Sequence, residues 1–307
     1  MNNQQIKTNI LIPGAIALGG VVLFSSKSVF AKMAYAYKAD PLTVLYFRML
    51  FALPLALIIG YYFEKRREWQ GINTRDVVLT ALISVLGYYV SALFNFFGLL
   101  YVEASIERLI LFLYPTMVIV LSAVFANKKI SFYQVLAISV SYAGLFIAFA
   151  DKLMIDNSTK FWYGAFLILM SSFTYAIFLT IADGLISRMG SVRFTTIAIV
   201  SMSVCIILHV IIVGKAQVSG FDQHVYWYCL IMGVFSTVIP VYMFNAAIEK
   251  LGSSNIAIVS CLGPICTLAF SAALLSESVS VYQLIGTVVV IGGILIIYLK
   301  KRNHANT

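Results

Sequence analysis

Residues 102–116 read VEASIERLILFLYPT, and this stretch decides how the chain is interpreted. Glu107 and Arg108 stand side by side near the start of an apolar run that continues to about Ala126, long enough to cross a bilayer as a helix. A charged side chain at the centre of a bilayer costs about 2.5 to 3.5 kcal/mol on insertion scales. Charges at that depth are candidates for a functional site, and the surrounding sequence indicates what kind.

The composition is that of an integral membrane protein. The chain has 307 residues, of which 61% are hydrophobic and 11% are charged, and its mean hydropathy is +0.95. Soluble globular domains do not reach these values. The long apolar runs predict membrane-spanning helices and an all-α fold, because strands of a barrel would read as short segments of alternating polarity.

The apolar runs predict ten transmembrane helices. Their approximate ranges are 11–33, 42–63, 77–100, 105–126, 132–150, 162–186, 194–213, 226–248, 255–275 and 281–299.

The charge distribution gives the orientation of these helices. The net charge of +9 does not indicate nucleic-acid binding, since the basic residues collect in alternate loops. With the N-terminus inside the cell, the inner segments hold thirteen of the 21 lysines and arginines and the outer loops hold four. Cytoplasmic loops of membrane proteins carry such an excess, so both termini are predicted to be cytoplasmic.

The chain carries an internal repeat. The segment LYPTMVIVLSAVFANKKISFYQ (113–134) aligns with LGPICTLAFSAALLSESVSVYQ (262–283) at a constant offset of 149 residues, which pairs Pro115 with Pro264. The halves are predicted as residues 1–151 and 152–307. Five helices in each half is an odd number, so the second half enters the membrane inverted, which is an architecture of alternating-access transporters.

These features resemble a known family. The segments DPLTVLYFRML (40–50) and ASIERLILFLYP (104–115), with the Pro115/Pro264 pair, are similar to the EamA-type members of the drug/metabolite transporter superfamily. The resemblance implies a multi-pass protein of the bacterial plasma (inner) membrane that moves a small metabolite, in many members by export of amino acids or related compounds. It also implies a central cavity between spans 1, 3, 4, 6, 8 and 9. The family's Gly-Glu after span 4 is Asn127-Lys128 here, whereas Ser276-Glu277 keeps the glutamate in the second half.

The embedded charges are the first candidates for substrate binding or coupling. Lys27, Arg48 and Glu107 lie at a similar depth below the outer boundary when residues are counted at 1.5 Å each. Glu107 and Arg108 point about 100° apart on a helix, so we expect Glu107 to pair with Lys27 or Arg48 instead. Such a pair either exchanges for substrate or a proton during transport or fixes helix packing as a static ion pair.

An excess of buried cations favours an anionic substrate. The outer half holds four cations, counting Lys32 and Arg108, against the single anion Glu107. A carboxylate or phosphate on the substrate would balance them. The alternative is that Lys32 and Arg108 extend their long side chains to the interface and need no partner.

Uncharged polar groups and prolines complete the prediction. Further substrate-binding candidates are Tyr88, Tyr89, Asn95, Tyr175 and Asn245. Pro115 and Pro264 interrupt spans 4 and 9 at equivalent places and are predicted to act as helix breaks or hinges.

Other classes of protein fit the sequence less well. The three histidines form no catalytic pair, the cysteines show no ligand spacing, and no phosphate-binding loop is present, so neither an enzyme nor a bound metal or cofactor is predicted. We therefore predict a secondary transporter, monomeric or homodimeric, for an amino acid or other carboxylate-bearing solute, with protons as a candidate coupling ion through Glu107. An importer or exchanger, or a non-transporting regulatory membrane protein, is the alternative.

Overall fold

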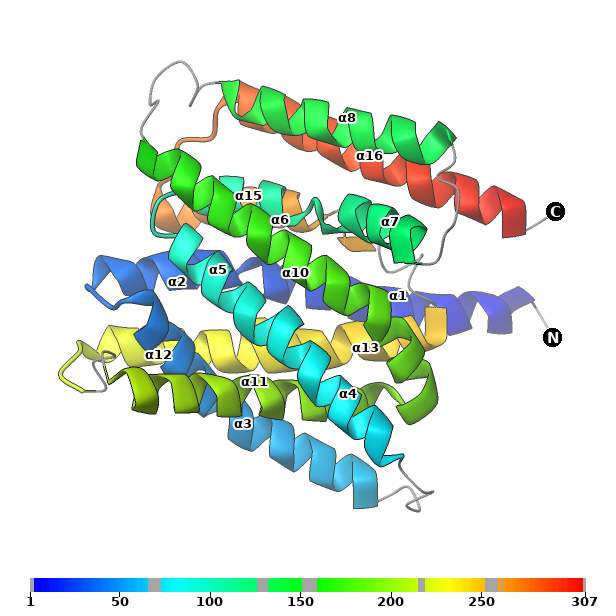
Figure 1. The fold of residues 1–307 in the computed structure, drawn as a ribbon. Helices are drawn as coiled ribbons and strands as arrows, with labels where there is room; N and C mark the ends of the chain where they lie inside the picture. The colour runs from blue at the N-terminus through cyan, green and yellow to red at the C-terminus, as the bar shows by residue number, and fades with distance from the viewer. Residues whose placement is uncertain are drawn as a thin grey trace.

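The computed structural model describes residues 3–65, 73–125, 132–150, 159–214, 219–251, 259–260 and 262–305 (Figure 1). Every regular element within these ranges is helical, and two single-turn π-helical segments, η1 and η2, interrupt longer helices. The elements are α1 (Asn3–Ser25), α2 (Lys27–Ala36), α3 (Pro41–Lys65), α4 (Thr74–Ser84), η1 (Val85–Val90), α5 (Ser91–Gly98), α6 (Ala104–Leu111), α7 (Tyr114–Phe125), α8 (Phe132–Ala148), α10 (Thr159–Met189), α11 (Ser191–Val213), α12 (Gln223–Gly233), η2 (Val234–Val238), α13 (Ile239–Leu251), α15 (Gly263–Leu275) and α16 (Val281–Ala305).

Within the described residues, seven segments are long and apolar enough to cross a membrane, by length and composition. Three shorter apolar helices, Phe132–Ala148, Gly263–Leu275 and Val281–Gly293, lie where three further spans are predicted. Large apolar side chains are exposed on the outside of the bundle, such as Ile212 at 80% and Phe132 at 73%. A lipid environment explains this exposure, because soluble proteins avoid extended apolar surface. The all-helical, multi-pass membrane class is confirmed.

The repeat is visible in the helix boundaries. Four pairs of elements begin 149 residues apart, the same offset that aligns the two halves of the sequence: α4 and α12, η1 and η2, α7 and α15, and α8 and α16. Helix packing follows the same relation. The helix α1 packs on α13 and η2, while α10 packs on α5 and η1. The predicted boundary between residues 151 and 152 lies outside the described residues.

The equivalent helices α8 and α16 run side by side in opposite directions along one edge of the bundle (Figure 1). Glycines set their close approach. A Cβ atom built on Gly286 would lie 2.5 Å from the Ala148 Cβ atom, and one built on Gly293 would lie 2.9 Å from the Ala137 carbonyl oxygen. Later residues of α16 contact earlier residues of α8, so these two equivalent helices are antiparallel. This is the relation that an inverted repeat requires.

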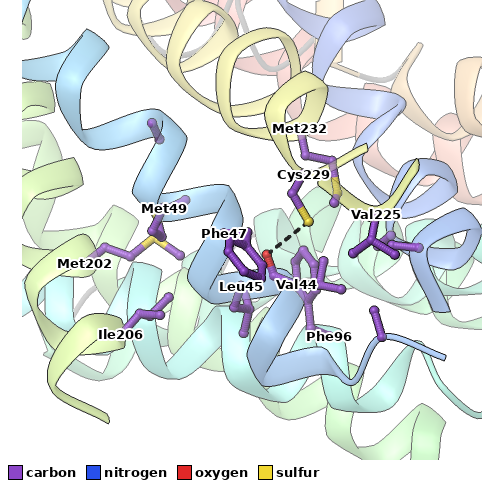
Figure 2. Packing of buried hydrophobic residues seen from close by; sticks show 14 of the residues in the cluster. Val44, Leu45, Phe47, Met49, Phe96, Met202, Ile206, Val225, Cys229 and Met232 are labelled. Atoms are coloured by element: carbon purple, nitrogen blue, oxygen red, sulfur yellow. Dashed lines mark hydrogen bonds between the residues drawn. The ribbon is translucent and has the colours of Figure 1, made fainter. Parts of the chain in front are cut away.

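The largest apolar core joins the two halves. It gathers residues of α2, α3, α5, α11 and α12, including Leu45, Phe96 and Met202, which are at most 3% exposed. Figure 2 shows part of this cluster, in which the Cys229 thiol lies 3.8 Å from the Val44 carbonyl oxygen. Cys205, Cys229 and Cys266 are free thiols, and Cys261 lies outside the described residues. This core fixes α3 against α11 and α12, which positions Arg48 for the site described next.

Candidate functional site

The candidate site forms where several helices are interrupted. The first span breaks at Ser26 between α1 and α2, and the fourth span breaks at Phe112 and Leu113 between α6 and α7 (Figure 1). Interrupted backbone inside a bilayer occurs where protein covers it or where it borders a water-filled cavity. Breaks of this kind are a common feature of transporter binding sites.

The two prolines lie at equivalent places, each at the beginning of a helix, and Pro115 follows the break in the fourth span. Pro115 is the second residue of α7, and Pro264 is the second residue of α15. Neither kinks a continuous helix; each begins a new one. The physical reason is that the first turn of a helix has no intrahelical partner for its N–H groups, so proline is accommodated there at no cost.

Polar side chains satisfy part of the interrupted backbone. The Ser25 hydroxyl donates to the Val21 carbonyl at 2.7 Å and lies 3.2 Å from the Gly263 carbonyl oxygen. The Thr267 hydroxyl donates to the Ser25 carbonyl at 3.1 Å. These bonds hold the break in the first span against the beginning of α15.

Glu107 is the centre of the charged cluster. Its side chain is fully buried on α6 and accepts hydrogen bonds from the Ser28 hydroxyl and the Asn95 amide, both at 2.5 Å. The Lys27 ammonium lies 4.0 Å from Glu107 Oε1 and donates to Asn95 Oδ1 at 3.1 Å. The structure therefore places Glu107 with Lys27 rather than with Arg48, and Asn95 bridges the pair.

Arg48 lies beside this cluster and makes a different contact. Its Nε group donates to the Thr237 hydroxyl of η2 at 2.7 Å, and its guanidinium carbon lies 5.2 Å from the centre of the Phe96 ring. Thr237 in turn donates to the Met232 carbonyl at 2.7 Å. The π-helical segment thus presents a hydroxyl to a cation that is 95% buried.

Arg108 faces away from Glu107, as their spacing predicts. The side chain is 7% exposed, and among the described residues its Nε atom has no hydrogen-bond partner. The guanidinium lies 5.0 Å from the centre of the Phe24 ring. Its electrostatic neighbours besides Glu107 are Tyr114, Tyr175 and Cys266.

The other predicted residues divide into two groups. Tyr88 and Tyr175 belong to one aromatic cluster, with ring centres 6.3 Å apart, and Tyr175 also meets the Tyr114 ring at 5.2 Å. Tyr89 instead bonds His209 of α11 at 2.7 Å, and Asn245 donates to Thr195 at 2.5 Å. These two bonds join helices away from the charged cluster.

Several residues of the site carried a weak signal in the sequence. Ser28 and Phe96 each follow a predicted residue directly, and Phe24 stands nearly one helical turn before Lys27. Aromatic rings one turn from a buried cation are suitable for cation–π contacts. That spacing could have identified Phe24, which lies 5.3 Å from the Lys27 ammonium. Within the described ranges, no three His, Cys, Asp or Glu side chains are placed to hold a metal ion.

Comparisons with known proteins identify the family. The model of the EamA-like transporter family matches the chain twice, at residues 12–150 and 162–299. The chain belongs to this family. An EamA-like relative described as the uncharacterized transporter YcbK of Bacillus subtilis is 29% identical over 92% of both chains. An uncharacterized transporter of Archaeoglobus fulgidus is 23% identical over 85% of this chain and 90% of its own. One crystal structure matches with a TM-score of 0.68 at 12% identity over 92% of this chain and 97% of that one, which shows the fold.

The glutamate that this EamA-like chain keeps in its second half joins the two halves at one end of the bundle. Ser276 ends α15 in a left-handed conformation, with φ of 53°. Glu277 then accepts from the Ala104 N–H at the start of α6 at 3.1 Å and lies 3.8 Å from the Lys32 ammonium. The starts of α6 and α16 lie at the end opposite the two chain termini (Figure 1). A carboxylate at the positive end of a helix stabilises this closure.

The Glu277 contact predicts that Glu277→Gln makes this end of the bundle more accessible to solvent. This partly exposed pair is worth about 0.2 to 1 kcal/mol, so its loss should open this end of the bundle up to about fivefold more often. The measurement is labelling of a cysteine at buried Val102 by a membrane-impermeant thiol reagent, with the native cysteines replaced by alanine. A cysteine at Lys38, an exposed position, is the control and should label equally with and without the Glu277→Gln substitution. Equal labelling at Val102 in both backgrounds would show that Glu277 does not hold this end closed.

Proposed function

We propose that this EamA-like protein is a secondary transporter that moves a small metabolite bearing a carboxylate group, such as an amino acid or a related compound, out of the cell by alternating access. The proposal rests on the buried cluster of Lys27, Asn95 and Glu107, beside which Arg108 Nε has no hydrogen-bond partner in the described part of the chain. Buried charges in membrane helices are costly, and in membrane proteins they mark solute and proton pathways.

The proposed arrangement in the membrane is ten helices in two inverted halves of five, with both termini in the cytoplasm of a bacterium. The antiparallel pairing of α8 with α16 supports the inversion. The excess of lysine and arginine in alternate loops supports the orientation. In that orientation the Glu277 contact closes the outer end, so the described conformation is closed to the outside.

Alternating access follows from the way the site is built. The charged residues come from the first half, and the site contacts the second half at two points: Arg48 donates to Thr237 of η2, and the Ser25 hydroxyl lies 3.2 Å from the Gly263 carbonyl oxygen at the start of α15. Rocking one half against the other changes the contacts between Arg48 and Thr237 and between Ser25 and Gly263. The site would thereby open first to one side and then to the other.

Glu107 is the proposed site of proton coupling. Its carboxylate meets the Lys27 ammonium only at 4.0 Å, and Asn95 contacts both groups. When Glu107 takes a proton, the attraction to Lys27 is lost, and the Asn95 bridge can rearrange. Export would then be driven by protons moving inward.

Untargeted mass spectrometry of medium and cell extract tests the proposed function. The strains lack the protein, overexpress it, or overexpress Glu107→Gln. We expect at least one carboxylate-bearing metabolite to accumulate outside on overexpression and inside on deletion, with no such change for Glu107→Gln. The opposite movement would make the protein an importer. Unchanged metabolites in several media would contradict transport.

A further inference from the structure

The buried charges do not balance among the described residues of the site. Lys27, Arg48 and Arg108 are each at least 93% buried, and Glu107 is the one buried carboxylate among them. The Glu107 carboxylate already pairs with the Lys27 ammonium and accepts hydrogen bonds from Ser28 and Asn95. No described carboxylate lies within ion-pair distance of either guanidinium group.

Arg108 is the cation whose hydrogen bonds are least complete. In the part of the chain that the structure describes, its Nε atom is buried without a hydrogen-bond partner, whereas the Nε atom of Arg48 bonds Thr237. The Phe24 ring and the C-terminal end of α6 offset part of its charge. Among the described residues, neither supplies an acceptor to Nε, one of the donors in the fixed planar fork of the guanidinium. An unsatisfied buried donor is costly, so one in a native protein calls for an explanation such as a bound water, ion or ligand.

A glycine lets the backbone at the start of α15 approach Arg108 closely. A Cβ atom at Gly263 would fall 2.6 Å from Arg108 Nη2 and 3.2 Å from its Nε atom, so only glycine leaves the guanidinium in place. Gly263 also begins α15, and the start of a helix carries partial positive charge. Two sources of positive potential therefore meet at one point.

We propose that the transported solute carries net negative charge and that its carboxylate or phosphate group binds Arg108 at the start of α15. This inference rests on the proposed transport function and narrows it. Zwitterionic amino acids fit less well, because the carboxylate that would receive their ammonium group, Glu107, is fully buried and already contacts three partners. An anion, in contrast, supplies an acceptor for Arg108 Nε and offsets the surplus positive charge.

The binding test uses the purified full-length protein and measures thermal stabilisation by defined probes. The probes are succinate, inorganic phosphate, leucine as a zwitterion, and chloride. We expect succinate or phosphate to stabilise the protein at concentrations where leucine and chloride do not. Succinate acting alone indicates a carboxylate substrate, and phosphate acting alone indicates a phosphate ester.

Three variants assign the effect to Arg108. Arg108→Gln should weaken binding of whichever anion stabilises the wild-type protein by about ten- to a hundredfold, the range for hydrogen bonds to charged groups. Arg108→Lys should retain weaker binding. Gly263→Ala keeps the charge but displaces the guanidinium, and it should also weaken binding, which decides the question if Arg108→Gln does not fold. Lys38→Gln, which removes an exposed charge, is the matched control and should bind as the wild type does.

Distinct results overturn the inference. A response to chloride alone, no response to either anion, or stabilisation by leucine that Arg108→Gln leaves unchanged would each contradict it. If one of these results is obtained but mass spectrometry shows a metabolite moved by the wild-type protein, the transport function stands and only the proposed anion preference is wrong. If no metabolite moves, the proposed function itself fails.

Discussion

Glu107→Gln is expected to reduce transport to the level of membranes without the protein. Glutamine keeps the size of the side chain but removes the charge that faces the buried Lys27 ammonium. Removing one member of a buried ion pair costs about 3 to 5 kcal/mol, because the other charge remains buried without compensation. The variant should therefore also unfold at a lower temperature, and both properties are measured on the purified, reconstituted protein.

A double variant separates a working ion pair from a static one. Lys27→Met combined with Glu107→Gln removes both charges, and replacing a whole buried pair by neutral residues is often harmless to stability. We expect thermal stability to return toward the wild-type value while transport stays absent. Wild-type transport by the double variant would mean that the pair only holds helices together. The exposed pair of Asp76 and Arg188, joined at 3.1 Å, provides a control: Asp76→Asn with Arg188→Gln should transport normally.

Gly286→Val is expected to cause a large loss of stability without touching the charged cluster. The glycine lies where α16 crosses α8, and a Cβ atom there would come within 2.5 Å of Ala148 Cβ and within 2.6 Å of its backbone nitrogen. Because the opposing atoms include backbone, the helices must separate along the contact that joins the last helices of the two halves. Overpacking costs about 1 to 3 kcal/mol, and we expect the upper end of that range. Thermal unfolding of the purified protein in detergent measures the change.

The same helix provides the comparison for this substitution. Gly292 also lies on α16, but a Cβ atom there would meet no described atom within 4 Å. Gly292→Val should therefore unfold within about 0.5 kcal/mol of the wild type, as substitutions outside packed contacts do. Equal destabilisation by the two variants would show that helix propensity, rather than the approach of α8 and α16, determines the effect.

Much of the architecture could be predicted because it depends on patterns within single helices. Runs of apolar residues fix the helices, and the offset of 149 residues in the sequence reappears in the starts of α7 and α15 and of η1 and η2. The π-helical segments themselves could not be predicted. Val85–Val90 and Val234–Val238 consist largely of residues common in any membrane helix, and the extra residue in the turn is stabilised by tertiary contacts.

The depth of the charged residues in the membrane could be predicted from the sequence, but which of them pair could not. Counting residues at 1.5 Å each placed Lys27, Arg48 and Glu107 at one level, but rotation about the helix axis decides which of them meet. The break at Ser26 changes that rotation for Lys27, and it brings the ammonium to Asn95 and Glu107. Tyr89 could not be told from Tyr88 for the same reason. Adjacent residues point about 100° apart, and only Tyr88 faces Tyr175.

Release of solutes from proteoliposomes tests transport through the Glu107 cluster most directly. Vesicles with purified wild-type protein, with Glu107→Gln, or without protein are loaded with a defined mixture of amino acids, dicarboxylates and phosphate esters, and the external solution is analysed by mass spectrometry over time. We predict that at least one carboxylate- or phosphate-bearing solute leaves only the wild-type vesicles. Release at the same rate from all three preparations, or equal release through the wild type and Glu107→Gln, would contradict the proposed role of the cluster.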